Sequence, residues 1–290
     1  MMPKVLLCDG HNLAFRAFYG IRELSRSDGF PTNMIHGWLR TLWRLEDDVQ
    51  PDEICVFFDK GGSPRREKIL PQYKENRGAP PEGFSERLEW VKKLTMALGH
   101  FSFDMVGLEA DDLIASAVRQ KKVSGAELII VSADKDLAQL VDLNVSQLLP
   151  PPTANPRLGW RTLDVDGVKG KFGVPPNGIL DYLSVIGDQS DNIPGISGVG
   201  PKTAVKWLAE HENLENLIQN AGRLTPKRFC SVVYENRDRL MMNRELIRLE
   251  DDVEFDIPDP KGVDQSQLRD ILLEMEMSKS WEEAQKRYGK

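Results

Sequence analysis

The chain has few of the residues that build zinc sites or disulfide frameworks. Its 290 residues include three cysteines and four histidines, without the close spacing of a zinc site. No apolar run reaches the roughly 18 residues of a membrane-spanning helix, and the N-terminus lacks the charged-then-apolar pattern of a secretory signal. We therefore expect a soluble, cytoplasmic protein in which Cys8, Cys55 and Cys230 are small apolar residues in a reducing compartment.

Length and net charge leave most globular classes open. A chain of 290 residues and 32.8 kDa holds one large or two modest domains. Its formal net charge of −7 argues weakly against a polyanionic partner. Net charge is a poor guide, however, where acidic residues are concentrated in one site.

Nine carboxylates stand in five short clusters spread over much of the chain. Three clusters follow apolar, β-branched runs near residues 4–9, 53–58 and 127–132, which are typical of buried parallel strands. The carboxyl ends of such strands meet at one edge of a sheet, where open α/β proteins bind ligands. So many like charges stay ionised together only when cations hold them, which indicates divalent metal. The nine are Asp9, Asp59, Glu109, Asp111, Asp112, Asp134, Asp136, Asp188 and Asp191.

Helix capping is the competing explanation for any one of these acids. Asp is a common N-cap and turn residue, and Glu109 and Asp112 fit the first turn of a helix. Capping does not explain why three strand ends, a helix start and the turn at residues 187–191 are all acidic, whereas metal binding does. His11 is the histidine near an acidic cluster, and we expect it to be structural or to orient a ligand.

The first half of the sequence alternates strands and helices, which predicts a mostly parallel sheet with helices on both faces. Turn formers at residues 150–160 lead out of the sheet, and short helices follow. We place a boundary after residue 163, between an α/β core of residues 1–163 and a helical domain of residues 164–290. The expected strands are 4–9, 53–58, 101–104 and 127–132, and the expected helices are 12–24, 33–47, 84–98 and 110–122.

A basic segment at about residues 61–81 is expected to be a functional loop. Between Lys60 and Arg77 there are six basic residues and two acidic ones, and glycines and prolines interrupt regular structure. Long loops inside compact domains are usually functional or disordered, so a solvated loop without a function is the alternative. Tyr73 beside Lys74 favours function, because an aromatic ring can stack on a base while the cation meets a phosphate.

A glycine-rich turn, Gly195-Ile-Ser-Gly-Val-Gly200, precedes a predicted helix that carries Lys202 and Lys206. Backbone N–H groups of such a turn receive phosphate oxygens, and the two lysines lie one helical turn apart. A Rossmann fingerprint fits poorly because no strand precedes the glycines. A helix-hairpin-helix at about residues 188–210, which would hold a DNA backbone without reading bases, explains the motif better.

Together these motifs resemble the 5′-nuclease superfamily, in particular the 5′→3′ exonuclease domain of bacterial DNA polymerase I and the stand-alone phage and bacterial flap endonucleases. The resemblance covers roughly residues 4–255 in the family's order. It implies a PIN-like α/β core, an arch at about 61–81 over the active site, and a helix-hairpin-helix domain. It implies a structure-specific 5′ nuclease, acting as flap endonuclease and 5′→3′ exonuclease near single-strand/duplex junctions of DNA. The matching segments are 9–16, 58–59, 73–77, 107–112, 133–137, 187–194 and 195–204.

The resemblance also implies roles for individual residues. The acids correspond to ligands of two Mg²⁺ ions, with Mn²⁺ as a substitute, and a potassium ion is implied at carbonyls near Ile196 and Val199. Asp9, Asp59, Glu109, Asp111 and Asp112 correspond to the first ion, and Asp134, Asp136, Asp188 and Asp191 to the second, with Asp134 as the candidate bridge. The implied catalytic residues are Lys74, Arg66 and Asp134. The implied DNA contacts are Arg65, Arg66, Tyr73, Lys74, Arg77, Gly198, Gly200, Lys202, Thr203 and Lys206.

Two departures and two rival functions qualify the resemblance. Arg65 and Lys68 stand where many relatives have an aromatic residue and an acid, which leaves the ordering of the arch and its flap-length preference open. A PIN-type ribonuclease is disfavoured by the hairpin and the basic insertion, and a catalytically impaired DNA-junction binder by retention of the acids. No polymerase domain follows residue 290, so we expect a stand-alone monomer. Residues 256–290, with Trp281, are expected to cover the core rather than dock a partner.

Overall fold

Six strands form the central sheet of the computed structural model, which describes residues 2–152 and 155–289. Their order is β3-β2-β1-β4-β5-β6; all neighbours pair in parallel except β5 and β6, which are antiparallel. The mostly parallel sheet is confirmed, but β5 and β6 were not expected from the sequence. The strands are β1 (Lys4–Asp9), β2 (Glu53–Phe58), β3 (Phe101–Asp104), β4 (Glu127–Val131), β5 (Val145–Leu149) and β6 (Arg161–Leu163).

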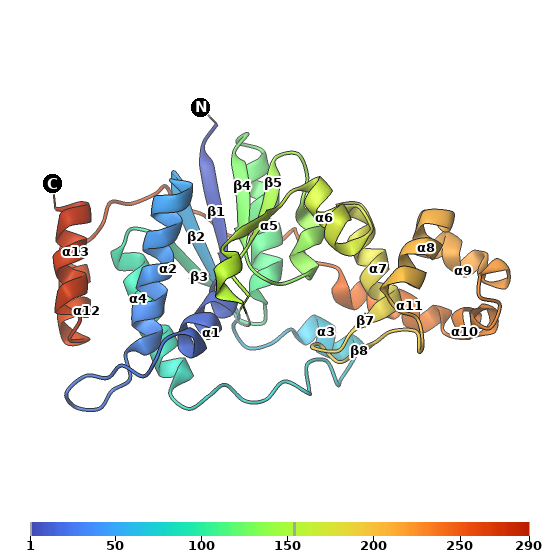
Figure 1. Cartoon of the computed structure of the whole chain (residues 1–290), viewed down its shortest axis with the longest axis horizontal. Helices are drawn as coiled ribbons and strands as arrows, with labels where there is room; N and C mark the ends of the chain where they lie inside the picture. The colour runs from blue at the N-terminus through green and yellow to red at the C-terminus, as the bar shows by residue number, and fades with distance from the viewer. Residues whose placement is uncertain (1, 153–154, 290) are drawn as a thin grey trace.

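Helices cover both faces of this sheet (Figure 1). Alternate residues of β1 point to opposite faces, so Leu6 and Cys8 pack with α1, α2 and α4 while Val5 and Leu7 pack with α5. Cys55 is also fully buried, as expected. No helix in the described part of the chain is both long and apolar enough to cross a membrane. These helices are α1 (Gly10–Gly20), α2 (Asn33–Val49), α4 (Phe84–Ala97) and α5 (Ala110–Lys122).

A second core lies among the helices that follow the sheet. It is built around Trp207 and Leu183 and includes Leu149 and Leu163 from the last two strands. A short two-stranded ribbon, β7 (Gly187–Asp188) and β8 (Ile193–Pro194), leaves this helical part toward the sheet edge (Figure 1). The helices are α6 (Val165–Phe172), α7 (Ile179–Ile186), α8 (Pro201–His211), α9 (Leu214–Gln219), α10 (Phe229–Glu235) and α11 (Arg237–Ile247).

The end of the chain returns to the sheet, which corrects the expectation that residues 164–290 form one helical domain. Residues 248–264 cross the α5 face as an irregular strap, in which Phe255 stacks on Phe103 at 4.8 Å between ring centroids. Helices α12 (Gln265–Glu274) and α13 (Ser278–Tyr288) then pack beside α2 and α4 (Figure 1). Leu272 is fully buried there and Trp281 packs against the same core. The expectation that this segment covers the core is confirmed.

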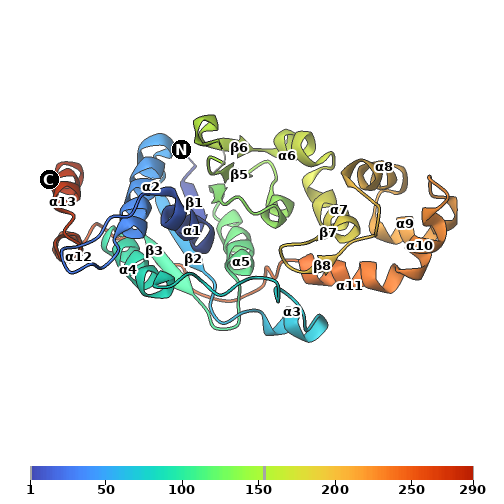
Figure 2. The same ribbon diagram turned by 60° about the horizontal axis from the view of Figure 1, so that its bottom comes forward.

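The basic segment contains a helix, so the expectation of a loop throughout is wrong. Helix α3 (Pro64–Ile69) begins after Ser63, whose hydroxyl accepts a hydrogen bond from the Arg66 N–H at 3.4 Å. Pro64 occupies the first helical position, where its missing N–H costs nothing and its fixed φ favours the helix. The chain after α3 then runs along the carboxyl edge of the sheet toward α4 (Figures 1 and 2).

Candidate active site

Acids from three strands meet at the carboxyl edge of the sheet. Asp9 ends β1, Asp59 follows β2, and Asp134 lies three residues after β4. Asp9 also caps α1, because its Oδ1 accepts from the Asn12 N–H at 2.9 Å, and Asp59 Oδ1 accepts from the Ala110 N–H at 2.7 Å at the start of α5. Capping and convergence therefore coexist in the same carboxylates.

A first acidic group consists of Asp9, Asp59 and Asp111. Burial, followed by the charge of Asp59, raises the pKa of Asp9 to about 7. Burial and the charges of Asp134, Asp9 and Asp59 also raise the pKa of Asp111. These acids oppose one another's ionisation, and a cation among them would relieve the repulsion.

A second acidic group consists of Asp136, Asp188 and Asp191. Each offers one oxygen, and the three oxygens lie within 4.8 Å of one another. Asp136 Oδ1 is buried and, among the described residues, has no hydrogen-bond partner. A buried carboxylate oxygen without a donor is costly, and oxygen ligands of this kind suit Mg²⁺ or Ca²⁺. The residues present therefore fit a divalent ion.

Asp134 connects the two groups. Burial raises its pKa, and so do the charges of Asp191 and Asp188 from the second group. Asp134 in turn raises the pKa of Asp111 and Asp9 in the first. Its Oδ1 accepts from the Asp136 N–H at 2.9 Å, and its charge interacts with acids of both groups.

Arg66 is buried in an ion network, which corrects its assignment as a residue that meets phosphate. Its side chain is 2 % exposed, and its two terminal nitrogens lie 2.5 and 2.7 Å from the oxygens of Asp112. Arg66 Nη1 also donates to Glu109 Oε2 at 2.9 Å. Asp112 is fully buried and additionally accepts from the Glu250 N–H at 2.9 Å. Both carboxylate oxygens of Asp112 are thus engaged by Arg66 and the backbone in this structure, and its role as a metal ligand stays a prediction.

The expectation that Tyr73 stacks on a base is wrong. The residue is 9 % exposed, and its hydroxyl lies 3.0 Å from Glu109 Oε2 and 3.1 Å from Asp191 Oδ2. Burial, reinforced by these two carboxylates, raises its pKa. Sequence reasoning failed because an aromatic beside a lysine does not reveal that acids distant in the chain bind its hydroxyl.

Two basic side chains that were expected to contact DNA, Lys74 and Arg77, also face the acidic residues. Lys74 Nζ lies 2.5 Å from Glu109 Oε1 and 3.8 Å from Asp191 Oδ2 of the second group, and its charge acts on Asp111 of the first. Burial opposes its charge, but Glu109 and Asp191 outweigh it and the pKa of Lys74 is raised. Arg77 pairs with Asp191 and keeps a side chain that is 46 % exposed.

Arg65 is bound by the segment at and after the end of α11, and its expected contact with DNA stays a prediction. Its guanidinium donates to the Glu245 and Arg248 carbonyls at 3.2 and 3.0 Å and lies 3.1 Å from Glu250 Oε1. The departure from the family pattern at Arg65 thus fixes α3 to the end of α11.

Supporting residues around the acids include some that the sequence did not reveal. His11 Nδ1 accepts from the Asp59 N–H at 3.0 Å, and burial lowers the pKa of His11, so the expected structural role is confirmed. Ser132 Oγ donates to Asp9 Oδ2 at 2.8 Å, and Gln147 Nε2 donates to the Asp134 carbonyl at 2.6 Å. Lys135 was also missed, although its place between Asp134 and Asp136 was a signal that could have found it.

The glycine-rich turn lies between α7 and α8, as the helix-hairpin-helix prediction requires. Gly198 has a φ of +77°, and the Val199 N–H donates to the Ile196 carbonyl at 3.0 Å to close the turn. The side chains and glycines expected to meet DNA are exposed or half-buried, so their role stays a prediction that the geometry allows. They are Gly198, Gly200, Lys202, Thr203 and Lys206.

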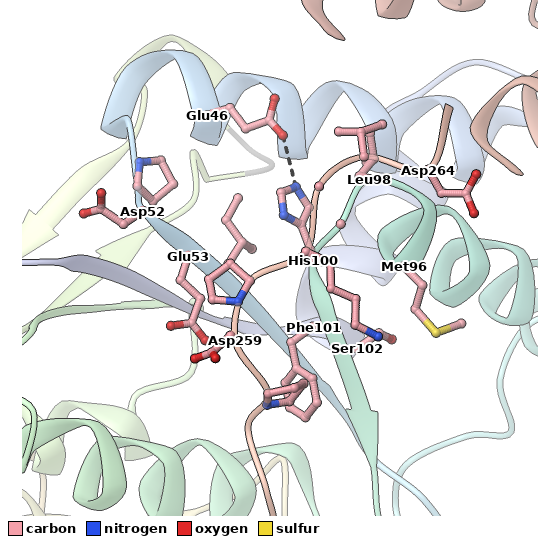
Figure 3. Close-up of a pocket in the computed structure, with 18 of the residues that line it drawn as sticks. Glu46, Asp52, Glu53, Met96, Leu98, His100, Phe101, Ser102, Asp259 and Asp264 are labelled. Carbon is pink, nitrogen blue, oxygen red and sulfur yellow. Dashed lines mark hydrogen bonds and ion pairs between the residues drawn. The ribbon is translucent and has the colours of Figure 1, made fainter. Parts of the chain in front are cut away.

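A cavity of about 690 Å³ lies at the opposite edge, beside the first residues of β2 and β3 (Figure 3). Two of its acids have side-chain partners: Glu46 binds His100 at 3.0 Å and Tyr288 at 2.6 Å, and Glu53 binds Lys121 at 2.6 Å. Glu46 and Glu53 are therefore each engaged by side chains of the protein, unlike Asp136 Oδ1 at the carboxyl edge.

The raised pKa of Asp9 predicts a pH-dependent stability difference in the absence of metal. Its pKa is about 7 when folded against 3.8 for an unperturbed carboxyl, so folding takes up a proton between these values and stability falls as the pH rises through them. We expect Asp9→Asn to stabilise the metal-free protein by about 1–3 kcal/mol at pH 8. The gain should be smaller at pH 5, where the unfolded carboxyl is already ionised but the folded one is not, and should vanish only below the unperturbed pKa of 3.8. Thermal unfolding in EDTA measures this difference; equal unfolding temperatures at pH 8 would contradict it.

Comparison with known proteins identifies two matching family models. Residues 4–173 match the model described as 5′-3′ exonuclease, N-terminal resolvase-like domain, and residues 174–270 match 5′-3′ exonuclease, C-terminal SAM fold. A 5′-3′ exonuclease of Aquifex aeolicus is 33 % identical over 289 residues, which cover 98 % of this chain and 96 % of that protein.

Longer relatives and a solved structure share parts or all of the fold. DNA polymerase I of Rhizobium leguminosarum is 34 % identical over 87 % of this chain, and the match spans 25 % of the length of the polymerase. A bacteriophage T5 flap endonuclease, solved in a pseudo-enzyme-product complex with DNA and metal ions, aligns with a TM-score of 0.72. It is 21 % identical, and the alignment covers 94 % of this chain and 99 % of that one. This likeness shows a shared fold.

Proposed function

The chain belongs to the 5′-3′ exonuclease family, and from this we propose that it is a metal-dependent, structure-specific nuclease that hydrolyses DNA near 5′ single-strand/duplex junctions. The observation that carries the proposal is the convergence of two acidic groups, joined by Asp134, at the carboxyl edge of the sheet. This is the edge where open α/β folds bind their ligands.

The acidic groups are proposed to hold two Mg²⁺ ions, for which Mn²⁺ would substitute. Asp9, Asp59 and Asp111 would hold the first and Asp136, Asp188 and Asp191 the second, with Asp134 between them. Bound there, a pair of divalent ions lowers the pKa of the attacking water and stabilises the leaving oxygen. Glu109 acts indirectly in this proposal, because it is occupied by Arg66, Tyr73 and Lys74.

The basic residues are proposed to place the DNA. Lys74 would contact the scissile phosphate, since its ammonium lies 3.8 Å from Asp191 of the second acidic group and its charge acts on Asp111 of the first. Arg77 would contact a neighbouring phosphate through its exposed side. The glycine-rich turn with Lys202, Thr203 and Lys206 would hold the duplex backbone, and carbonyls near Ile196 and Val199 would bind potassium.

The remaining assignments are also proposals. A boundary near residue 163 is proposed between the sheet and the helices that follow it up to α11, whose core also takes in Leu149 and Leu163; the two family models meet at residues 173 and 174. A cytoplasmic monomer that meets DNA and no membrane agrees with the DNA-processing names of the relatives.

A substrate panel tests the function. We expect cleavage of a 5′-flap DNA with Mg²⁺, no cleavage in EDTA, and recovery when Mg²⁺ is added back. Single-stranded RNA of the flap's length should be cut far more slowly. Faster RNA turnover would favour the PIN-type ribonuclease, and tight flap binding without cleavage would favour the impaired junction binder.

A further inference from the structure

Lys135 places its ammonium against the second acidic group. The Nζ atom lies 2.5 Å from Asp188 Oδ2 and 3.9 Å from Asp136 Oδ1, on the segment that also carries Asp134. Its side chain is 31 % exposed, whereas that of Asp188 is 8 % exposed. The ammonium therefore reaches from the solvent side into the group of oxygens that would hold the second ion.

The contact compensates the negative charge of a buried acid, because the ammonium lies 2.5 Å from Asp188 Oδ2. Burial opposes ionisation of Asp188, but Lys135 and the Ser190 hydroxyl outweigh it and lower the pKa of this carboxyl. By contrast, the pKa of Asp136 is raised, mainly by burial and Asp134. The ion pair of Lys122 with Asp142 differs in burial: its length is 2.7 Å, but both side chains are well exposed to solvent.

Lys135 is not needed to hold the acids in place. Asp188 Oδ1 accepts from the Ser190 N–H at 2.9 Å and from its hydroxyl at 2.7 Å. Asp191 is held by Arg77 and by the Tyr73 hydroxyl, and the Asp136 N–H bonds to Asp134. Removing the ammonium would thus leave the oxygens in position while it removes a positive charge from among them.

We propose that Lys135 is an internal counter-cation of the second acidic group, which balances its charge without metal and competes with the second divalent ion for Asp188. The inference rests on the proposed two-ion function. It assigns to Lys135 an electrostatic role, in which its charge sets the ion concentration at which the second site fills. A like charge a few ångströms from a bound cation weakens binding, and partial exposure screens the effect.

Mn²⁺ binding to the complete protein, followed by electron paramagnetic resonance without DNA, tests the proposal. We expect wild type to bind two ions, and Lys135→Met to bind the weaker one about tenfold more tightly. Lys135→Gln should behave alike, and Lys122→Met serves as the matched control with wild-type affinities. In EDTA the melting temperature of Lys135→Met should fall by about 2–4 °C and recover with saturating Mn²⁺.

The outcomes separate this inference from the function on which it rests. Two ions in wild type, with equal or weaker binding of the second in both Lys135 variants, would overturn the role of Lys135 and leave the two-ion site intact. The two-ion assignment itself would be overturned if wild type bound only one ion, or if Asp188→Asn left binding of the second ion unchanged. Tighter binding of one ion in the Lys135 variants, absent when Asp188→Asn is added, supports the proposal.

Discussion

Replacing Asp134 by Asn is expected to lower turnover on 5′-flap DNA by about 10³-fold, equivalent to about 4 kcal/mol of transition-state stabilisation. Asp134 is the carboxylate that connects the two acidic groups. Its charge raises the pKa of Asp111 in the first group, and the charge of Asp188 in the second group raises the pKa of Asp134. Asn keeps the size of the side chain and an oxygen for the Asp136 N–H bond, so the loop should keep its shape. The loss would report the missing negative charge.

The measurement is single-turnover cleavage at saturating Mg²⁺, with DNA affinity determined separately in Ca²⁺. Affinity should change little, because the DNA contacts are proposed to come from basic side chains and the glycine-rich turn. Asp164→Asn is the matched control: Asp164 caps α6 by accepting from the Gly167 N–H at 2.7 Å, and Asn caps helices equally well. Turnover of Asp134→Asn within threefold of wild type would show that Asp134 is no ligand.

The strands and the position of the site were predictable because both follow from periodicity. Apolar runs such as Val5 to Cys8 have no alternative to burial in a sheet, and the residue after a parallel strand has a fixed location at its carboxyl edge. Asp9 and Asp59 were therefore placed correctly before any coordinates. Strand β5 was missed because Gln147 interrupts its apolar pattern; this fully buried amide binds the Ser132 and Asp134 carbonyls.

The contacts between the residues of the basic segment and distant carboxylates were not predictable from the local sequence. A basic segment looks like a DNA-binding surface whether its charges face solvent or carboxylates, and Arg66 meets Asp112 across 46 residues of chain. Tyr73 likewise meets Asp191 across 118 residues. Such contacts depend on how α3 and the β7–β8 ribbon fold over the sheet edge, which the sequence around each residue does not encode.

Replacing Lys74 by Met is expected to lower the maximal cleavage rate by about 10²-fold while the KM changes little. The Lys74 ammonium lies 3.8 Å from Asp191 of the second acidic group, and its charge acts on Asp111 of the first. The backbone N–H of Lys74 donates to the Asp191 carbonyl at 3.1 Å and holds the backbone at a φ of +56°. A fixed cation beside a phosphate stabilises the charge that develops in the transition state, and loss of one such group costs about 3 kcal/mol. Glu109 would still be bound by Arg66 and Tyr73, so the fold should persist.

The control for Lys74 is Lys68→Met, an exposed lysine on α3. Lys68→Met removes one positive charge from the same basic segment as Lys74→Met. If the lysine charges contribute only long-range attraction for DNA, both variants should show the same change in KM and in its salt dependence. A role at the reacting phosphate predicts instead that the maximal rate falls in Lys74→Met alone. If both variants lose affinity equally and cleave at the wild-type maximal rate, Lys74 belongs to the DNA-binding surface and the charge at the scissile phosphate must come from another group.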